Sequence, residues 1–270
     1  MKVTQIRNAT ILIETAIEGN QKGILVDPMF APMSAIPSLK YATTNRRRNP
    51  LVELPSNMDE LKSRVTCCLI THCQKGHFDH LDRAATKWLR DNNIPVYCST
   101  QDSAFLRKKG LAVVTLDPST ENHFLNGSIK LVPCLHGEGL IGKMMAHGYG
   151  YHIPLPGESS IYVTGDTILT NVVKNFIKQT QPKIVVIPAG GAIFDLGREI
   201  IMGLSEAIQI GEFAKGLVTA NHLEALDHCP VTRESIRSEI EVRGWKHRFF
   251  VPDDGESFNF NRLNLLKVSS

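Results

Sequence analysis

The sequence predicts an α/β fold in which two β-sheets pack face to face and helices cover their outer sides. Short apolar or alternating segments, which are typical of strands, recur from the first residues to the last third of the chain. Segments with apolar residues at helical spacing lie between them in both halves. Because each sheet and each helix has to bury an apolar face, this mixture favours two stacked sheets between layers of helices.

The first half of the chain is expected to begin with three consecutive strands, at residues 3–6, 10–14 and 23–27. Residues 29–57 follow, rich in Pro, Ser, Asn and Arg and without a clear period. So long a loop inside a compact domain usually has a function, often as a lid or a binding loop. The other elements expected here are a helix at 58–64, a strand at 65–70, a helix at 81–92, a strand at 95–98 and a helix at 101–109.

The second half changes from mostly strands to alternating helices and strands. Turns are expected at Asn126-Gly127 and Pro156-Gly157, and Gly244 can end the last helix. The strands expected in the middle of the chain lie at 113–116, 123–125, 129–135, 145–153 and 161–164. The last third is expected to hold a helix at 170–180, a strand at 184–188, a helix at 205–215, a strand at 217–220, a helix at 232–244 and an apolar segment at 249–252.

Length and composition are ordinary for one globular domain, and we expect residues 1–270 to form a single one. The hydrophobic content of 42% and the charged content of 21% in 270 residues allow a large buried core. The net charge of +3 is too small to argue for binding to nucleic acid or to a membrane surface. No apolar stretch reaches the roughly 18 residues of a membrane span, and the N-terminus lacks the apolar core of a signal peptide.

The six cysteines and the one basic run allow two further expectations. The cysteines show no CxxC pairing and most lie in apolar segments, as is typical of reduced thiols in a cytoplasmic protein. Cys73 and Cys229 differ from the others because each lies close to candidate metal ligands. The basic run Arg46-Arg47-Arg48 is interpreted either as a solvated loop or as a contact for an anionic substrate.

The stretch most informative about function is 71–82, which directly follows an apolar strand. It carries the imidazoles of His72, His77 and His80 and two carboxylates, one of them that of Asp79. Imidazole and carboxylate are the groups that hold a borderline divalent ion such as Zn²⁺ or Mn²⁺. A strand that ends and presents them at once is how a rigid scaffold displays a metal at its rim. The stretch therefore predicts a metal site rather than a group of solvated side chains.

Four more acidic or imidazole residues lie where apolar strands end: Asp27, His136, Asp166 and His222. Each alone is a weak signal, because a polar residue often ends a strand. Together they indicate a sheet edge that brings two His and two Asp toward one rim, as a dinuclear site requires.

With these motifs the chain resembles the metallo-β-lactamase superfamily, and more closely its metal-dependent hydrolase branch similar to ascorbate-6-phosphate lactonase. The resemblance covers nearly the whole chain, from 10–14 through Asp27-Pro28 to His222. It implies a metallo-β-lactamase-like four-layer αββα sandwich and the activity of a metal-dependent hydrolase. The residues that carry it are Thr71-His72 followed by His77-x-Asp79-His80 for the family's HxHxDH signature, and later His136, Gly165-Asp166-Thr167 and His222.

Two departures from the family's pattern concern the metal site. Strict spacing would put Lys75 where the first His belongs, because Gln74-Lys75-Gly76 reads as a three-residue insertion. Gly76 can supply the backbone angles of a bulge that returns His72 to the metal. The alternative is that His72 turns away, Lys75 fills the space, and the first site is weakened or only one ion binds. In addition, Asn8 stands where the branch often has a His.

The resemblance implies a centre for two divalent ions, Zn²⁺ or Mn²⁺, with Fe²⁺ as a further option. Asp79 and Asp166 would be the catalytic residues, Asp166 as the bridge and Asp79 as the group that holds the nucleophilic water or passes a proton. Asp27 would orient a ligand from outside, and Lys75 and His228 would support the ligands or contact the substrate. In this assignment one ion is held by His72, His77 and His136, and the other by Asp79, His80 and His222.

The leading interpretation is a cytoplasmic enzyme that hydrolyses a small lactone, ester, amide or phosphodiester. Its expected partner is a small-molecule substrate, and an anionic substrate is one of the options. Neither nucleic acid nor a membrane is expected as a partner, and a homo-oligomer is compatible with the sequence. The alternative is a non-catalytic or single-metal binding module with a disrupted first metal motif. An iron-based redox protein with the same ligand types is a third class. Such proteins normally need a flavin domain, and these 270 residues contain neither the length nor the motif for one. Fold alone does not determine the substrate.

Overall fold

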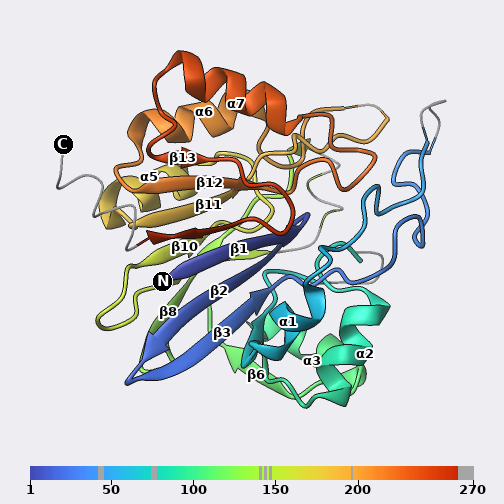
Figure 1. The fold of residues 1–270 in the computed structure, drawn as a ribbon, viewed down its shortest axis with the longest axis vertical. Helices are drawn as coiled ribbons and strands as arrows, with labels where there is room; N and C mark the ends of the chain where they lie inside the picture. The colour runs from blue at the N-terminus through green and yellow to red at the C-terminus, as the bar shows by residue number, and fades with distance from the viewer. Residues whose placement is uncertain are drawn as a thin grey trace.

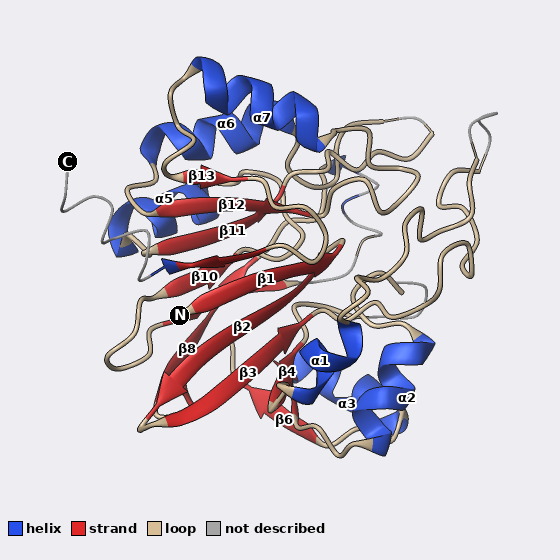
Figure 2. Cartoon of the chain, in the orientation of Figure 1, coloured by secondary structure: helices blue, strands red, loops and turns tan. Residues whose placement is uncertain are grey.

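The structure is a computed structural model that describes residues 1–41, 46–73, 78–139, 142, 145, 148–195 and 197–260. Within these residues the strands form two sheets that lie face to face, with helices on both outer sides (Figures 1 and 2). The predicted α/β arrangement, an αββα sandwich, is therefore confirmed.

The first sheet contains, in the described part of the chain, seven strands, in the order β14 (Ser257–Asn259), β1 (Lys2–Arg7), β2 (Thr10–Ile17), β3 (Asn20–Val26), β4 (Cys67–Leu69), β5 (Val96–Ser99) and β6 (Val113–Leu116). Strands β1 to β3 pair antiparallel, whereas β4, β5 and β6 continue the sheet parallel to β3. Each parallel connection needs a crossover, which here is a helix on the outer face (Figure 1). These helices are α1 (Met58–Ser63), α2 (Arg83–Asp91) and α3 (Thr100–Lys108).

The second sheet has the same division into an antiparallel and a parallel part. Its described strands run in the order β13 (Phe249–Phe250), β12 (Leu217–Asn221), β11 (Ile184–Pro188), β10 (Ile161–Val163), β9 (Tyr149–Ile153), β8 (Gly127–Pro133) and β7 (Glu121–Phe124). Strands β7 to β10 pair antiparallel and β10 to β13 parallel. Helices α5 (Asn171–Thr180), α6 (Leu204–Phe213) and α7 (Arg233–Val242) cover its outer face (Figure 2). None of the described helices is long and apolar enough to cross a membrane.

Strand β2 shows how the apolar runs of the sequence serve two cores at once. Ile11 and Ile13 belong to the cluster between the sheets, whereas Leu12 belongs to the cluster between the first sheet and its helices. In β11, likewise, Val186 lies between the sheets and Val185 lies under the helices of the second sheet. Because both faces of these strands are buried, they appear in the sequence as continuous apolar runs.

The structure differs from the expected elements mainly near the end of the chain. The sequence pattern does not predict β14, whose three residues carry no strand signal of their own. The strand forms because it pairs antiparallel with the edge of β1, where Val3 lies opposite Phe258. Strand β9 begins at Tyr149 rather than at 145, and β13 is limited to Phe249–Phe250.

The loop between β3 and α1 is fastened to the first sheet by the guanidinium of Arg7. Its Nη atoms donate hydrogen bonds to the carbonyl oxygens of Met29 (2.7 Å), Ala31 (2.8 Å) and Val52 (3.0 Å). Burial lowers the pKa of Arg7 to about 10, although Asp82 opposes the shift. Both parts of this loop are thereby held against β1.

Replacing Arg7 by lysine is expected to destabilise the folded protein by about 2–4 kcal/mol, because an ammonium cannot match the fork of three bonds and leaves a buried acceptor unpaired. Urea unfolding followed by circular dichroism measures the change in the free energy of unfolding. The control is Arg64→Lys, since Arg64 makes partly exposed ion pairs with Glu14 and Glu60 that contribute less than about 1 kcal/mol. Equal losses in the two variants would contradict the anchoring role of Arg7.

Candidate metal centre

The predicted site residues that the structure describes lie in loops that follow strands of both sheets. They are Asp27 after β3, His72, Asp79 and His80 after β4, His136 after β8, Asp166 after β10 and His222 after β12. All are buried, with no more than 7% of any residue exposed. Loops that leave the carboxyl ends of parallel strands gather at one edge of a sheet, and here the edges of the two sheets contribute to one site. Lys75 and His77 lie outside the described residues.

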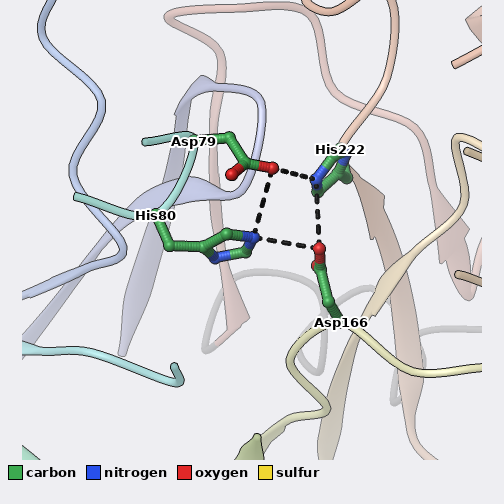
Figure 3. A group of neighbouring side chains, drawn as sticks. All are labelled: Asp79, His80, Asp166 and His222. Atoms are coloured by element: carbon green, nitrogen blue, oxygen red, sulfur yellow. Dashed lines mark hydrogen bonds and ion pairs between the residues drawn. The ribbon is translucent and has the colours of Figure 1, made fainter. Parts of the chain in front are cut away.

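Four of these side chains surround one point (Figure 3). Oδ2 of Asp166 is 2.9 Å from Nε2 of His80 and 3.4 Å from Nε2 of His222. Oδ2 of Asp79 lies 3.6 Å and 3.7 Å from the same two nitrogens. A tetrahedral ion with bonds of ~2.1 Å would hold its ligand atoms about 3.4 Å apart. The spacing of these carboxylates and imidazoles therefore fits one divalent ion.

A second group of donors shares Asp166. His72, His136 and Asp166 offer one ligand atom each within 4.8 Å of one another, and Oδ2 of Asp166 is 3.7 Å from Nε2 of His136. The ring of His72 packs against that of His80, with centroids 4.1 Å apart. His72 therefore lies beside the centre and is not turned away from it. Asp166 lies where it could bridge two ions.

Asp27 supports the centre from behind His80. Its Oδ2 lies 3.0 Å from Nδ1 of His80, so that the opposite nitrogen, Nε2, faces Asp166. The carboxylate also accepts hydrogen bonds from the backbone N–H of Thr71 (2.8 Å) and from its hydroxyl (2.6 Å). This is the contact expected of a carboxylate that orients an imidazole without binding the ion itself.

The other imidazoles are oriented in the same way by different groups. Nδ1 of His136 bonds to the carbonyl oxygen of Ile200 (2.8 Å), and Nδ1 of His72 lies 3.1 Å from the hydroxyl of Thr71. Nδ1 of His222 lies 3.5 Å from Sγ of Cys229. Sequence reasoning missed the roles of Thr71 and Ile200. The position of Thr71 directly before His72 is a signal for the first, but a backbone carbonyl 64 residues from His136 has none.

Left-handed backbone turns aim two of these side chains. Asp27 and His222 have φ angles of 46° and 59°, a region uncommon for residues other than glycine and asparagine. The N–H of His222 donates to the carbonyl oxygen of Asn8 (2.9 Å), and the side-chain amide of Asn8 donates to the carbonyl oxygen of Asp79 (3.4 Å). Asn8 therefore joins the two ligand-bearing loops in place of the histidine that the resemblance suggests there. Such strain persists where the surrounding structure determines the conformation, often at functional sites.

The buried charges of the centre compensate one another. Burial by itself would raise the pKa of Asp166, but His80 and His222 hold that pKa well below its usual range. Burial by itself would lower the pKa of His80 and of His222, but Asp166 raises both well above the usual range. Buried carboxylates and imidazoles therefore stay together only with shared positive charge, from protons or from a metal ion. The donor set, its burial and its spacing fit divalent ions.

His228 and the basic run, both considered as substrate contacts, lie in different surroundings. His228 is 4% exposed and stacks on Phe194, with ring centroids 5.9 Å apart. Burial lowers the pKa of His228 to about 4 although Asp79 opposes the shift, so the ring is neutral at pH 7. The side chain of Arg48 donates to loop carbonyl oxygens, whereas Arg46 and Arg47 line a cavity of about 780 Å³ whose described lining includes none of the predicted ligands.

Comparison with known proteins shows relatives that match 72% to 96% of this chain, although no family model matches it. The UPF0173 protein YddR of Bacillus subtilis is 30% identical over 269 residues, which cover 96% of this chain and 100% of that protein. A UPF0173 metal-dependent hydrolase of Methylacidiphilum infernorum is 26% identical over 196 residues, which cover 72% of this chain and 80% of that protein.

Solved structures with the same fold agree with these relatives. An isothiocyanate hydrolase from Delia radicum gut bacteria is 30% identical, with a TM-score of 0.83 over 96% of this chain and 99% of that one. A possible metal-dependent hydrolase of Veillonella parvula has a TM-score of 0.84 at 24% identity, over 96% and 98% of the two chains. The metallo-β-lactamase fold protein YhfI of Bacillus subtilis has a TM-score of 0.61 at 13% identity, over 95% and 98%. The expected metallo-β-lactamase-like fold is confirmed.

The shared position of Asp166 leads to a prediction about stoichiometry. We expect the protein to bind about two divalent ions per chain, Asp166→Ala to lose both, and His136→Ala to lose one while the four-residue group remains. Elemental analysis after metal removal and reloading with zinc measures the content. His152→Ala is the control, because His152 is buried on β9 and belongs to neither donor group. If Asp166→Ala and His136→Ala lost the same number of ions, the bridging role would be wrong.

A second prediction concerns the carboxylate behind His80. Asp27→Asn is expected to weaken metal binding by about 10–100-fold, because the amide no longer fixes the ring orientation of His80 as a carboxylate does. Competition with a chromophoric zinc chelator measures the affinity. Asp117→Asn is the matched control, since Asp117 accepts its hydrogen bonds from Ser119 in an exposed turn. Unchanged zinc affinity in Asp27→Asn would show that His80 needs no support from this carboxylate.

Proposed function

The chain belongs to the UPF0173 family of metal-dependent hydrolases, and we propose that it hydrolyses a small substrate at a centre of two divalent ions. The observation that carries the proposal is the position of Asp166, whose carboxylate is common to two buried groups of imidazole and carboxylate donors. Two ions with a shared bridge can hold both the attacking and the leaving atoms of a hydrolytic reaction.

The proposed ligands follow the two donor groups. When bound, the ions would supply a water of lowered pKa and would stabilise negative charge that develops on the substrate. Imidazole with carboxylate suits Zn²⁺ and Mn²⁺ and also accepts Fe²⁺. We assign Asp79, His80 and His222 to one ion, His72, His136 and the undescribed His77 to the other, and Asp166 to both.

The two carboxylates of the centre are suited to different tasks. The side chain of Asp79 is 10% exposed, against 3% for that of Asp166, so Asp79 is the one that a substrate and its water reach more readily. Asp79 is therefore proposed to accept a proton from the attacking water at one carboxylate oxygen and to pass it to the leaving group. Asp166, whose pKa His80 and His222 hold low against the effect of burial, keeps its charge and bridges.

The proposed substrate is a small molecule with an electrophilic carbonyl or phosphoryl group: a lactone, ester, amide or phosphodiester. An isothiocyanate is a second candidate, because a 30% identical structure that matches almost the whole chain is an isothiocyanate hydrolase. In that reaction water adds its oxygen to the central carbon and both protons go to nitrogen. The C–N bond then breaks, and the products are an amine and carbonyl sulfide.

A single-metal or non-catalytic module is the alternative, motivated by the insertion after His72. The contact of His72 with His80 and its place in the second donor group support the two-ion proposal instead. A cytoplasmic location is proposed on separate grounds, since all six cysteines are free and most are buried.

Replacing Asp79 by alanine tests the proposed function. We expect kcat/KM to fall by about 10²-fold or more, because the variant lacks both a ligand and the proton-transfer carboxylate. The assays are hydrolysis of 4-nitrophenyl acetate, bis(4-nitrophenyl) phosphate and phenyl isothiocyanate by zinc- and manganese-loaded protein. Asp117→Asn should keep full activity. Wild type that has lost its metal to a chelator should recover activity when it is reloaded with zinc or manganese. Undiminished hydrolysis by Asp79→Ala would eliminate this mechanism.

A further inference from the structure

We propose that His228 contacts the substrate beside the metal centre and that, together with Phe194, it selects a neutral substrate with an apolar substituent. This inference rests on the proposed function and narrows its substrate class. It depends on three observations: an unpaired ring nitrogen, the position of the ring near the candidate ligands, and the apolar surface on which the ring lies.

The first observation is that His228 is buried without a partner for Nδ1. The residue is 4% exposed, and no described residue forms a hydrogen bond with this nitrogen. The Nδ1 atom of His136, by comparison, bonds to the carbonyl oxygen of Ile200. Buried polar atoms in proteins are nearly always paired, and an exception calls for a partner such as water or a ligand. Nδ1 of His228 is therefore available to a polar atom of a bound molecule.

The second observation places this ring at the edge of the metal centre. His228 lies six residues after His222, and its chain neighbour Cys229 has its Sγ 3.5 Å from Nδ1 of His222. The loop is held in place because the N–H of Ile193 donates to the carbonyl oxygen of His228 (2.9 Å). A ring that is held beside the loop of His222 can contact a substrate whose reacting group lies at the ions.

The third observation concerns the apolar surface around the ring. His228 and Phe194 are stacked, with 18° between their planes, and the ring centroid of Tyr41 lies 6.4 Å from that of Phe194. Phe194 also packs against a buried apolar cluster that includes Met29 and Leu226. The long loop after β3 and the loops after β11 and β12 all contribute to this surface. It suits an alkyl or aryl substituent.

Basic side chains line a neighbouring cavity whose described lining does not include His228. Lys40, Arg46 and Arg47 line this cavity of about 780 Å³, together with Asp227 and Cys229, the chain neighbours of His228. Asp227 in the same cavity accepts a hydrogen bond from the N–H of Arg47. Cationic groups would favour an anionic substrate, whereas His228 stacks on the uncharged Phe194 and has the carboxylates of Asp79, Asp166 and Asp227 among the charges that act on it. The surroundings of His228 thus favour a neutral substrate over an anionic one.

Ligand binding tests this inference without depending on turnover. Isothermal titration of the zinc-loaded protein compares acetohydroxamate with benzohydroxamate, which carry the same metal-binding group and differ in the aryl ring. Wild type should bind benzohydroxamate at least about 10-fold more tightly, a difference of about 1.4 kcal/mol. Phe194→Ala should lose this preference, and His228→Phe should weaken both ligands about 10-fold. His228→Gln, which keeps a polar side chain, should retain most of the affinity.

Hydrolysis supplies a second measurement, with a smaller change at Phe194. Wild type should have a higher kcat/KM for 4-nitrophenyl butyrate than for the anionic 4-nitrophenyl hemisuccinate, by about 10-fold or more. Phe194→Leu should raise KM for the butyrate more than it changes kcat. A preference of wild type for the hemisuccinate would overturn the inference.

A matched pair elsewhere in the fold serves as the control. His152 is also buried with an unpaired Nε2, and its ring lies 5.4 Å from that of Phe176, under helix α5. His152→Phe and Phe176→Leu should leave hydroxamate binding unchanged, and all variants should keep the zinc content of wild type. If wild type binds the hydroxamates and hydrolyses esters but His228→Phe and Phe194→Ala behave like it, only this inference fails. If zinc-loaded wild type does neither, the proposed function fails with it.

Discussion

The site depends on one carboxylate that is buried where water cannot solvate it. Asp166 is 3% exposed, and a carboxylate in such a place must either take up a proton or be compensated by positive charge. His80 and His222 supply that compensation at 2.9 Å and 3.4 Å, and divalent ions could supply it in the same space. This requirement explains why loops from distant parts of the chain converge on the end of β10.

The residues around the candidate ligands are the second requirement of the site, because a metal site needs donors that point in fixed directions as well as donors of a suitable kind. Asp27 and His222 adopt left-handed backbone conformations, and their N–H groups donate to the carbonyl oxygens of Leu69 and Asn8. Asn8 links the loops that carry Asp79 and His222. The ligands thus follow the ends of rigid strands, and hydrogen bonds between the loops fix their directions.

Much of the fold could be read from the sequence because its signals are local. The apolar runs of β2 and β11, the crossover helices and the turns each depend on residues within a few positions of one another. Strand β14 shows the limit, since Ser257–Asn259 becomes a strand only through the free edge of β1, more than two hundred residues earlier. Of the predicted site residues, Lys75 and His77 lie outside the described part of the chain, and their roles stay predictions.

For the site itself, the sequence alone determined the kinds of donor and the strand ends that carry them, because ligand chemistry and strand periodicity are properties of short segments. Only the tertiary structure decided which donors meet at Asp166, that His72 lies against His80, that the ring beside Asp27 is that of His80, and that Thr71 and the carbonyl of Ile200 orient other rings. The physical reason is that these contacts join segments far apart in the chain. Their distances follow from how two sheets pack on each other, which no local pattern encodes.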